Sequence, residues 1–489
     1  MLATPTKFAS IQIAFRLSAA LWLGLSTRAS AEEPAPADLM HLLSEAGLHD
    51  VRDERWNAYG QLTYISVFKL PWKAPYSNVN GSPNSFSTGY ERSFTETASL
   101  FFGVKLWSGG ELYAEPDLIG ERALSDLHGL GSVTENFELQ KTGGEAPNVY
   151  RARLFGRQTI GLGGEDIAVP SSILQLGTTV KSRRLVVTLG NVSVIDIFTR
   201  NNVTGDPRHT FFNEAFMTDS AFDFAADARG YTFGAAAELY WDAWVLRFGR
   251  FAPPKAPNQQ TLDLRLWTRY DDTLEVEHDH SIAGHPGAVR LLVYRNQVFS
   301  GRFDDAIRAY EQDPSKSAAN CPADTLSYGS TNASAPDFCW VRKVNIKRGI
   351  GLNLDQYVSE QVGLFLRTMI NDGASEVDAY DSAEFDLSAG GTVKGGLWSR
   401  PDDLFGAGFQ LGMISDIHAR YLELGGIDAF IGDGQLHTAP EMLIDIFYSL
   451  KVFRNVLVAA DYQLLFNPGY NADRSGPIHM PGFKIHAEF

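Results

Sequence analysis

Residues 483–489 read Phe-Lys-Ile-His-Ala-Glu-Phe, and this stretch decides the fold class. Apolar residues alternate strictly with polar or charged ones: Phe483, Lys484, Ile485, His486, Ala487, Glu488 and Phe489. Successive side chains of a β-strand point to opposite faces of its sheet, so this strand has one apolar face and one charged face. Two structures fit the pattern: a soluble sheet with one wet face, or a closed barrel with an apolar outside and a polar lumen.

Phe489 favours the barrel. It occupies the last position of an apolar row that would face lipid. An aromatic residue in this place resembles the assembly signal that outer-membrane barrels present to the barrel-assembly machinery.

The same alternation recurs from Arg55 onward, in segments separated by Gly, Asp, Asn and Pro clusters. In Val456–Phe466, for example, one face is apolar and the other carries Asp461 and Gln463. We count about seventeen such segments, whereas a bacterial barrel has an even number of strands. One of the seventeen segments is therefore not a strand. We expect the error between residues 173 and 190, where Ile173–Val180 and Arg184–Gly190 are both short. The sequence predicts an all-β protein, a transmembrane antiparallel β-barrel of sixteen to eighteen strands.

The N-terminal residues have the order of parts found in a secretory signal peptide. Lys7 and Arg16 precede the apolar run Leu17–Leu25, and Ala29–Ala31 form an A-x-A site. We expect cleavage after Ala31, with an uncleaved anchor as the alternative. Residues 32–52 are expected to form a periplasmic segment with one short helix, and residues 53–489 a single barrel domain in the outer membrane of a Gram-negative bacterium.

Composition and motifs exclude several classes. The chain has 58 acidic and 42 basic residues and a net charge of −16, so nucleic acid is not expected as a partner. No nucleophile elbow, P-loop, dinucleotide fingerprint or zinc-protease motif occurs, and we expect no enzymatic activity, no cofactor and no metal site. Cys321 and Cys339 are the only cysteines and are expected to form a disulfide within a polar loop.

Charged residues gather on the polar face of several predicted strands. Arg151, Arg153 and Arg157 share one face, and Glu275 and Glu277 form an acidic row. Other charged residues have the same parity: Glu238, Arg247, Arg290, Arg367 and Asp461. In a barrel, such opposed rows would line the lumen, where guanidinium and carboxylate groups hydrogen-bond passing hydroxyl groups. An ordinary salt-bridged face fits each residue equally well.

The chain also resembles the carbohydrate-selective porin family, OprB-like, over essentially all of the predicted mature length. The matching stretches are Trp56–Gln61, Tyr150–Phe155, Leu189–Asn191, Asp196–Phe198, Ala225–Thr232, Gly249–Phe251, Arg302–Ala306, Arg400–Asp403, Phe430–Gly434 and Asn467–Arg474. Many separate matches in order are more specific than any single motif.

The resemblance implies a 16-stranded barrel with long extracellular loops partly folded into its mouth. It implies passive uptake of small carbohydrates, glucose-like mono- and disaccharides, through a narrow charged constriction. Arg151 and Arg153 would line that constriction, with Glu275 and Glu277 as their counterpart. One departure from the family is Glu311–Trp340 with its cysteine pair, which could narrow or cover the entrance.

Two other functions remain open at this point. The first is a channel for polysaccharide export or for general diffusion, which would differ in lumen width. The second is a secreted, soluble, β-rich enzyme. The expected partners of a porin are small carbohydrates, outer-membrane lipid and the barrel-assembly machinery. Many porins are trimers, so a homotrimer is one of the oligomeric states left open.

Overall fold

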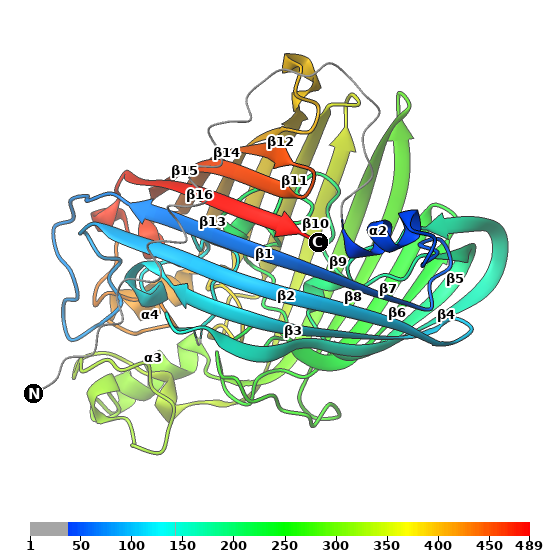
Figure 1. Cartoon of the computed structure of the whole chain (residues 1–489). Coiled ribbons are helices and arrows are strands. Elements are labelled where there is room, and N and C mark those ends of the chain that lie inside the picture. The colour runs from blue at the N-terminus through cyan, green and yellow to red at the C-terminus, as the bar shows by residue number, and fades with distance from the viewer. Residues whose placement is uncertain (1–37, 142) are drawn as a thin grey trace, which may run out of the picture. The chain divides into compact units, whose positions relative to one another are not determined.

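The computed structural model describes residues 38–141 and 143–489, and in them sixteen antiparallel strands form a closed barrel (Figure 1). The predicted signal peptide, residues 1–31, lies outside the described residues. The strands are β1 (Trp56–Lys69), β2 (Glu91–Trp107), β3 (Gly110–Arg122), β4 (Asn148–Val169), β5 (Thr178–Val192), β6 (Thr232–Trp241), β7 (Trp244–Phe251), β8 (Tyr270–Ile282), β9 (His285–Ser300), β10 (Lys343–Tyr357), β11 (Val362–Asn371), β12 (Phe385–Lys394), β13 (Leu404–Met413), β14 (Glu441–Phe453), β15 (Val456–Phe466) and β16 (Ile478–Glu488).

Each strand pairs with its neighbours in the chain, and β16 returns to pair with β1. Gln61 lies opposite Glu488 in this last pairing. Phe489 extends it, because its backbone N–H donates to the carbonyl of Gly60 at 2.9 Å and its carbonyl accepts from the Gly60 N–H at 2.7 Å. The barrel therefore has no open sheet edge at this seam.

The connections alternate between two ends of the barrel because neighbouring strands are antiparallel. At one end, here called the turn end, several connections have two residues, such as 108–109, 242–243 and 283–284. At the other, the loop end, the connections are long, such as 123–147, 193–231 and 301–342. The predicted strand Ile173–Val180 is wrong: residues 170–177 connect β4 to β5, and β5 already contains Thr178–Val180.

The described residues contain three α-helices, α2 (Leu39–Glu45), α3 (Phe303–Gln312) and α4 (Asp416–Glu423). Helix α2 is the short N-terminal helix that the leucine spacing predicts, and Asp38 caps it by accepting from the N–H of His41. Helices α3 and α4 pack together through Phe303 and Tyr421 at the loop end. Within the described part of the chain, none of the helices has the length and apolar character needed to span a bilayer.

The outer face of the barrel is an apolar surface. Ten of its residues are each between 37% and 50% exposed: Leu62, Leu100, Phe102, Leu246, Phe248, Leu291, Ile350, Leu364, Ile444 and Ile485. Trp107, Trp241 and Trp244 lie near the turn end and are exposed as well. A surface this apolar is suited to hydrocarbon rather than water, and the tryptophans match the aromatic girdle of a membrane barrel.

The inside of the barrel is largely filled by residues 193–231, here called the inner segment, which connect β5 to β6. The N–H of Asn213 donates to Asp445 on β14, and the N–H of Ala221 donates to Asp386 on β12. Contacts to several wall strands at once are possible only from within the ring. The phenylalanine rings of the segment, including Phe212 and Phe222, are buried. The core of this protein therefore lies in the lumen, between the inner segment and the wall.

Candidate pore lining

The inner face of β6–β9 carries a connected row of opposite charges, here called the ionic ladder. Arg247 bonds Glu238 at 3.1 Å, and Glu275 and Glu277 at 2.8 Å each. Arg290 continues the row by bonding Glu277 at 2.7 Å. These residues are directly opposite or diagonal across the antiparallel pairs, which brings their side chains into reach. All five are 7% exposed or less, so they are buried ion pairs rather than wetted groups.

The ionic ladder and its neighbours hold the inner segment. Glu275 accepts the N–H of Thr199 at 2.8 Å. Arg367, on β11, donates to the carbonyl of Met217 at 2.9 Å and to the Thr204 hydroxyl at 3.0 Å. The exposed fraction of Arg367 is 1%, and that of Asp461, on β15, is 5%. The alternation along each strand predicts that these charged residues face inward, and they do. The inner segment then covers them.

The three arginines of β4 do not share a face. Glu115 of β3 lies opposite Arg153 and the next residue, Pro116, lies opposite Arg151, so Ala152 is an extra residue at a β-bulge. Arg153 points inward, whereas Arg151 is exposed on the outer face beside Pro116. The expectation that Arg151 lies on the lumen face is therefore wrong.

The resemblance also implies that Glu275 and Glu277 line the constriction as the counterpart of the β4 arginines, but both acids are buried. Arg153 instead forms a bidentate pair with Asp196 of the inner segment, at 2.7 Å for both nitrogens, and bonds Glu115. Arg157 points inward near the turn end and donates to the carbonyl of Leu174 at 3.2 Å. Within the ionic ladder, Glu275 bonds Arg247, and Glu277 bonds both Arg247 and Arg290.

An open cavity of about 220 Å³ remains inside the barrel. Its walls come from the inner faces of β2–β4, from the loops 123–147 and 372–384, and from the inner segment. Of the residues predicted to line the pore, Arg153 lines this cavity. Pockets for drug-sized ligands are roughly 300–1,000 Å³, so this cavity suits a smaller solute.

Four side chains form a stack on the wall of the cavity, with two tyrosines in the middle and an arginine at each end, here called the aromatic–arginine stack. The guanidinium carbon of Arg229 lies 4.5 Å from the ring centre of Tyr150, and that of Arg153 lies 5.2 Å from the ring centre of Tyr231. The two tyrosine rings lie 6.0 Å apart. Asp117 accepts from both tyrosine hydroxyls, at 3.2 and 3.4 Å. Cation–π contacts and a shared carboxylate hold the four groups in register.

A second set of charged residues lines the same cavity. Burial raises the pKa of Glu214, and burial together with the neighbouring Glu214 carboxyl raises that of Asp381 well above its usual range. Tyr380 donates its hydroxyl to Glu214. Lys141 donates to Asn258 at 2.6 Å, and burial lowers its pKa. The cavity thus offers both guanidinium and carboxyl groups to a polar solute.

Sequence reasoning missed most of these cavity residues. Tyr150, Arg229 and Tyr231 fall within the matching stretches Tyr150–Phe155 and Ala225–Thr232, but the sequence pattern assigns them no role in the pore. Those two stretches, far apart in the chain, meet in the aromatic–arginine stack. Their shared composition, a tyrosine within two residues of an arginine, is the signal that could have found them.

Cys321 and Cys339 are joined in a disulfide, with their Cα atoms 5.9 Å apart. The bond lies within the connection between α3 and β10, at the loop end. The stretch Glu311–Trp340 thus belongs to the helical layer at this end, where Phe338 packs against Tyr421.

Comparisons with known proteins agree with this geometry. The family model of the carbohydrate-selective porins, OprB family, matches residues 103–489. The high-pH structure of Pseudomonas putida OprB superimposes with a TM-score of 0.63 at 14% identity, over 89% of this chain and 94% of that one. The outer membrane channel DcaP of Acinetobacter baumannii gives a TM-score of 0.48 at 10% identity, over 89% of this chain and 97% of that one. No curated protein sequence matches.

The two kinds of finding have different weight. At 14% identity the P. putida structure shows the fold alone. The family model covers well over half of the chain, including every strand from β3 to β16. This chain is a member of the OprB family of carbohydrate-selective porins, an outer-membrane sugar channel of a Gram-negative bacterium.

Proposed function

We propose that this porin carries glucose-like mono- and disaccharides by passive diffusion, and that the aromatic–arginine stack is where the sugar contacts the channel. The observation that supports this is the position of Tyr150, Arg153, Arg229 and Tyr231 on the wall of a cavity inside the barrel. A sugar ring has apolar C–H faces that pack on aromatic rings, and hydroxyl groups that hydrogen-bond guanidinium and carboxylate groups.

The filled lumen argues against polysaccharide export. The inner segment and the loop 123–147 meet inside the barrel, where the N–H of Phe137 donates to the carbonyl of Phe212 at 2.9 Å. A polymer would need a continuous wide passage, whereas a cavity of about 220 Å³ accommodates a small solute. A soluble enzyme is disfavoured by the exposed apolar residues on the outer face.

Arg151 and Arg153 give a matched pair of variants on one strand. Arg153→Ala removes the guanidinium from the cavity, whereas Arg151→Ala removes one from the outer face. In liposome swelling with glucose and maltose, we expect Arg153→Ala to change the uptake rates severalfold and Arg151→Ala to leave them at the wild-type level. Equal effects of the two variants, or none for Arg153→Ala, would contradict the proposal.

Arg153→Ala also leaves Glu115 and Asp196 without their partner, so folding needs a separate check. Heat-modifiable migration in gel electrophoresis reports a closed barrel. Tyr231→Leu is a second variant, because it keeps a bulky apolar side chain but removes the ring and the hydroxyl that donates to Asp117. It should alter sugar uptake more than the uptake of a small ion such as chloride.

The remaining predictions from the sequence are part of this proposal. We propose that export uses a signal peptide cleaved after Ala31, that residues 32–52 lie in the periplasm, and that Phe489 is read by the barrel-assembly machinery. The short connections of membrane barrels face the periplasm, so the turn end is assigned to that side and the loop end to the outside. A homotrimer is the oligomeric state to test first, by size in detergent.

A further inference from the structure

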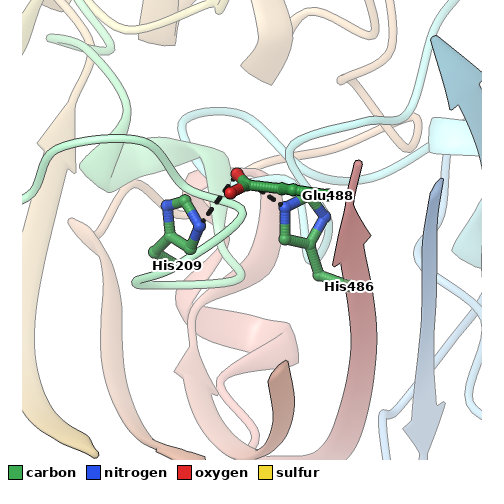
Figure 2. A group of neighbouring side chains, drawn as sticks. All are labelled: His209, His486 and Glu488. Atoms are coloured by element: carbon green, nitrogen blue, oxygen red, sulfur yellow. Dashed lines mark hydrogen bonds and ion pairs between the residues drawn. The ribbon is translucent and has the colours of Figure 1, made fainter. Parts of the chain in front are cut away.

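Three metal-ligating side chains meet at the turn end, between the inner segment and the last strand (Figure 2). His209 belongs to the inner segment, and His486 and Glu488 belong to β16. Glu488 Oε1 lies 3.2 Å from Nε2 of His209 and 3.2 Å from Nε2 of His486. One ligand atom from each of the three residues lies within 4.8 Å of the other two.

This spacing fits a tetrahedral ion. Zinc binds histidine nitrogen and carboxylate oxygen at about 2.0–2.2 Å, so two ligand atoms of a tetrahedron lie about 3.3 Å apart. The two nitrogen–oxygen distances, 3.2 Å each, are close to this value. Two histidines and one carboxylate are a ligand set that divalent transition metals use, and they leave one position for water.

His486 is oriented by a second contact. Its Nδ1 lies 3.0 Å from the hydroxyl of Thr63 on β1, and the residue is 1% exposed. When the other nitrogen of a histidine ring is held in this way, the ring presents Nε2 to the metal with a fixed orientation. The same ring turns Nε2 toward Glu488 Oε1, so the nitrogen that would bind an ion already faces the carboxylate ligand.

The site is also held together without an ion. Lys484 donates to the carbonyls of Pro207 and Thr210 at 2.6 and 3.0 Å, and these two residues flank the stretch that carries His209. The side chains of His209 and Glu488 are 39% and 40% exposed, so an ion can reach them from solvent. The ligands are thus positioned in advance and accessible.

We propose that His209, His486 and Glu488 bind a divalent transition-metal ion, with Zn²⁺ as the best match, and that the ion ties the inner segment to the last strand. No motif in the sequence predicts this site, because its ligands are brought together from residues 209 and 486 only by the fold. A bound ion would restrict the inner segment at the periplasmic end of the channel.

The test uses the full-length porin in detergent, produced without a histidine tag and stripped with EDTA. Zn²⁺ alone is titrated by equilibrium dialysis, and Co²⁺ is added in a parallel sample to record its absorption spectrum. We expect one Zn²⁺ per chain and a tetrahedral Co²⁺ spectrum. His209→Gln, His486→Gln and Glu488→Gln should each weaken binding at least tenfold, since each removes a ligand.

His437→Gln is the matched control. His437 bonds Asp473 at 2.8 Å but belongs to no three-ligand cluster among the described residues, so its loss should leave Zn²⁺ binding unchanged. Thr63→Val keeps all three ligands and removes only the orienting hydroxyl, so it should weaken binding by a smaller factor. This variant keeps the test valid if a ligand substitution disturbs assembly.

Thermal unfolding supplies an independent readout. Zn²⁺ should raise the midpoint of the wild-type protein and of His437→Gln, but not of the ligand variants, because binding to the folded state alone stabilises it. Absence of Zn²⁺ binding at micromolar concentration would overturn the proposal. Binding that is the same in the wild type and in all three ligand variants would overturn it equally, since the ion would then sit elsewhere.

Discussion

Lys347 is the wall residue whose removal should release the inner segment. On β10 it bonds Asp223 of the inner segment at 2.9 Å, and both side chains are 3% exposed or less. Asp223 also accepts the N–H groups of Asp378 and Ala379, at 2.8 and 2.9 Å, so it joins three parts of the interior. Lys347→Met keeps the length of the side chain but leaves the Asp223 carboxylate buried without its counter-charge.

The expected cost follows from that burial. Removing one partner of a buried ion pair destabilises by roughly 3–5 kcal/mol, whereas an exposed pair contributes about 0–1 kcal/mol. A loss of about 3 kcal/mol shifts the equilibrium between docked and released inner segment about a hundredfold. Lys343 on the same strand is the matched control, because its side chain is 60% exposed and bonds Asp305 at 2.7 Å.

Two assays read out the release. In planar bilayers, Lys347→Met should show a larger and noisier single-channel conductance than the wild type, and Lys343→Met should not. Trypsin should cut Lys347→Met within residues 193–231 faster than it cuts the other two proteins. If the conductance and the cleavage of Lys347→Met match those of Lys343→Met, the inner segment does not depend on this pair and the reasoning fails.

Three further predictions concern assembly, the loop end and pH. Phe489→Ala should lower the amount of folded porin in the outer membrane severalfold, as judged by heat-modifiable migration, whereas the outward-facing Tyr462→Ala should not; equal levels would remove Phe489 from assembly. Replacing Cys321 and Cys339 by Ser opens a loop with a sequence separation of 18 and should destabilise the connection by about 3 kcal/mol, which faster proteolysis between α3 and β10 would reveal. Burial raises the pKa of Glu135, in the loop 123–147, to about 7, although the N–H of Leu124 donates to it. Because the folded state then holds this proton more tightly than the unfolded state, stability should fall by about 3 kcal/mol as pH rises from 4.5 to 7, and thermal unfolding of Glu135→Gln should lack that slope.

The barrel was predictable because strand alternation is a local property. The structure confirms the predicted alternation in Val456–Phe466 and Phe483–Phe489. In both strands the polar residues face inward and the apolar residues between them face outward. Ile173–Val180 failed for the same local reason: a connection and the start of β5 together resemble a strand, and only pairing separates them. Local patterns thus give the number of strands to within one.

The site was less predictable because it depends on what covers each face. Parity placed Glu275 and Arg367 inward, but it cannot tell a wet lumen from one filled by the inner segment. At Ala152 a single extra residue reverses the parity of Arg151, and no periodicity carries across a bulge. The aromatic–arginine stack and the histidine cluster both join residues distant in the chain, which a single sequence does not reveal.

The seam between β1 and β16 has a consequence for how the molecule forms. Thr63 and His486 meet there although they are 423 residues apart in the chain. Bringing the ends of so long a stretch together directly would cost on the order of 5 kcal/mol in loop-closure entropy. Forming the sheet one hairpin at a time reduces that cost. Until β16 pairs with β1, however, the sheet has two open edges whose unpaired backbone groups can pair with other chains. The pairing of β16 with β1 is therefore the step with the largest sequence separation and the greatest risk of aggregation. A catalyst of membrane insertion would help most at this step.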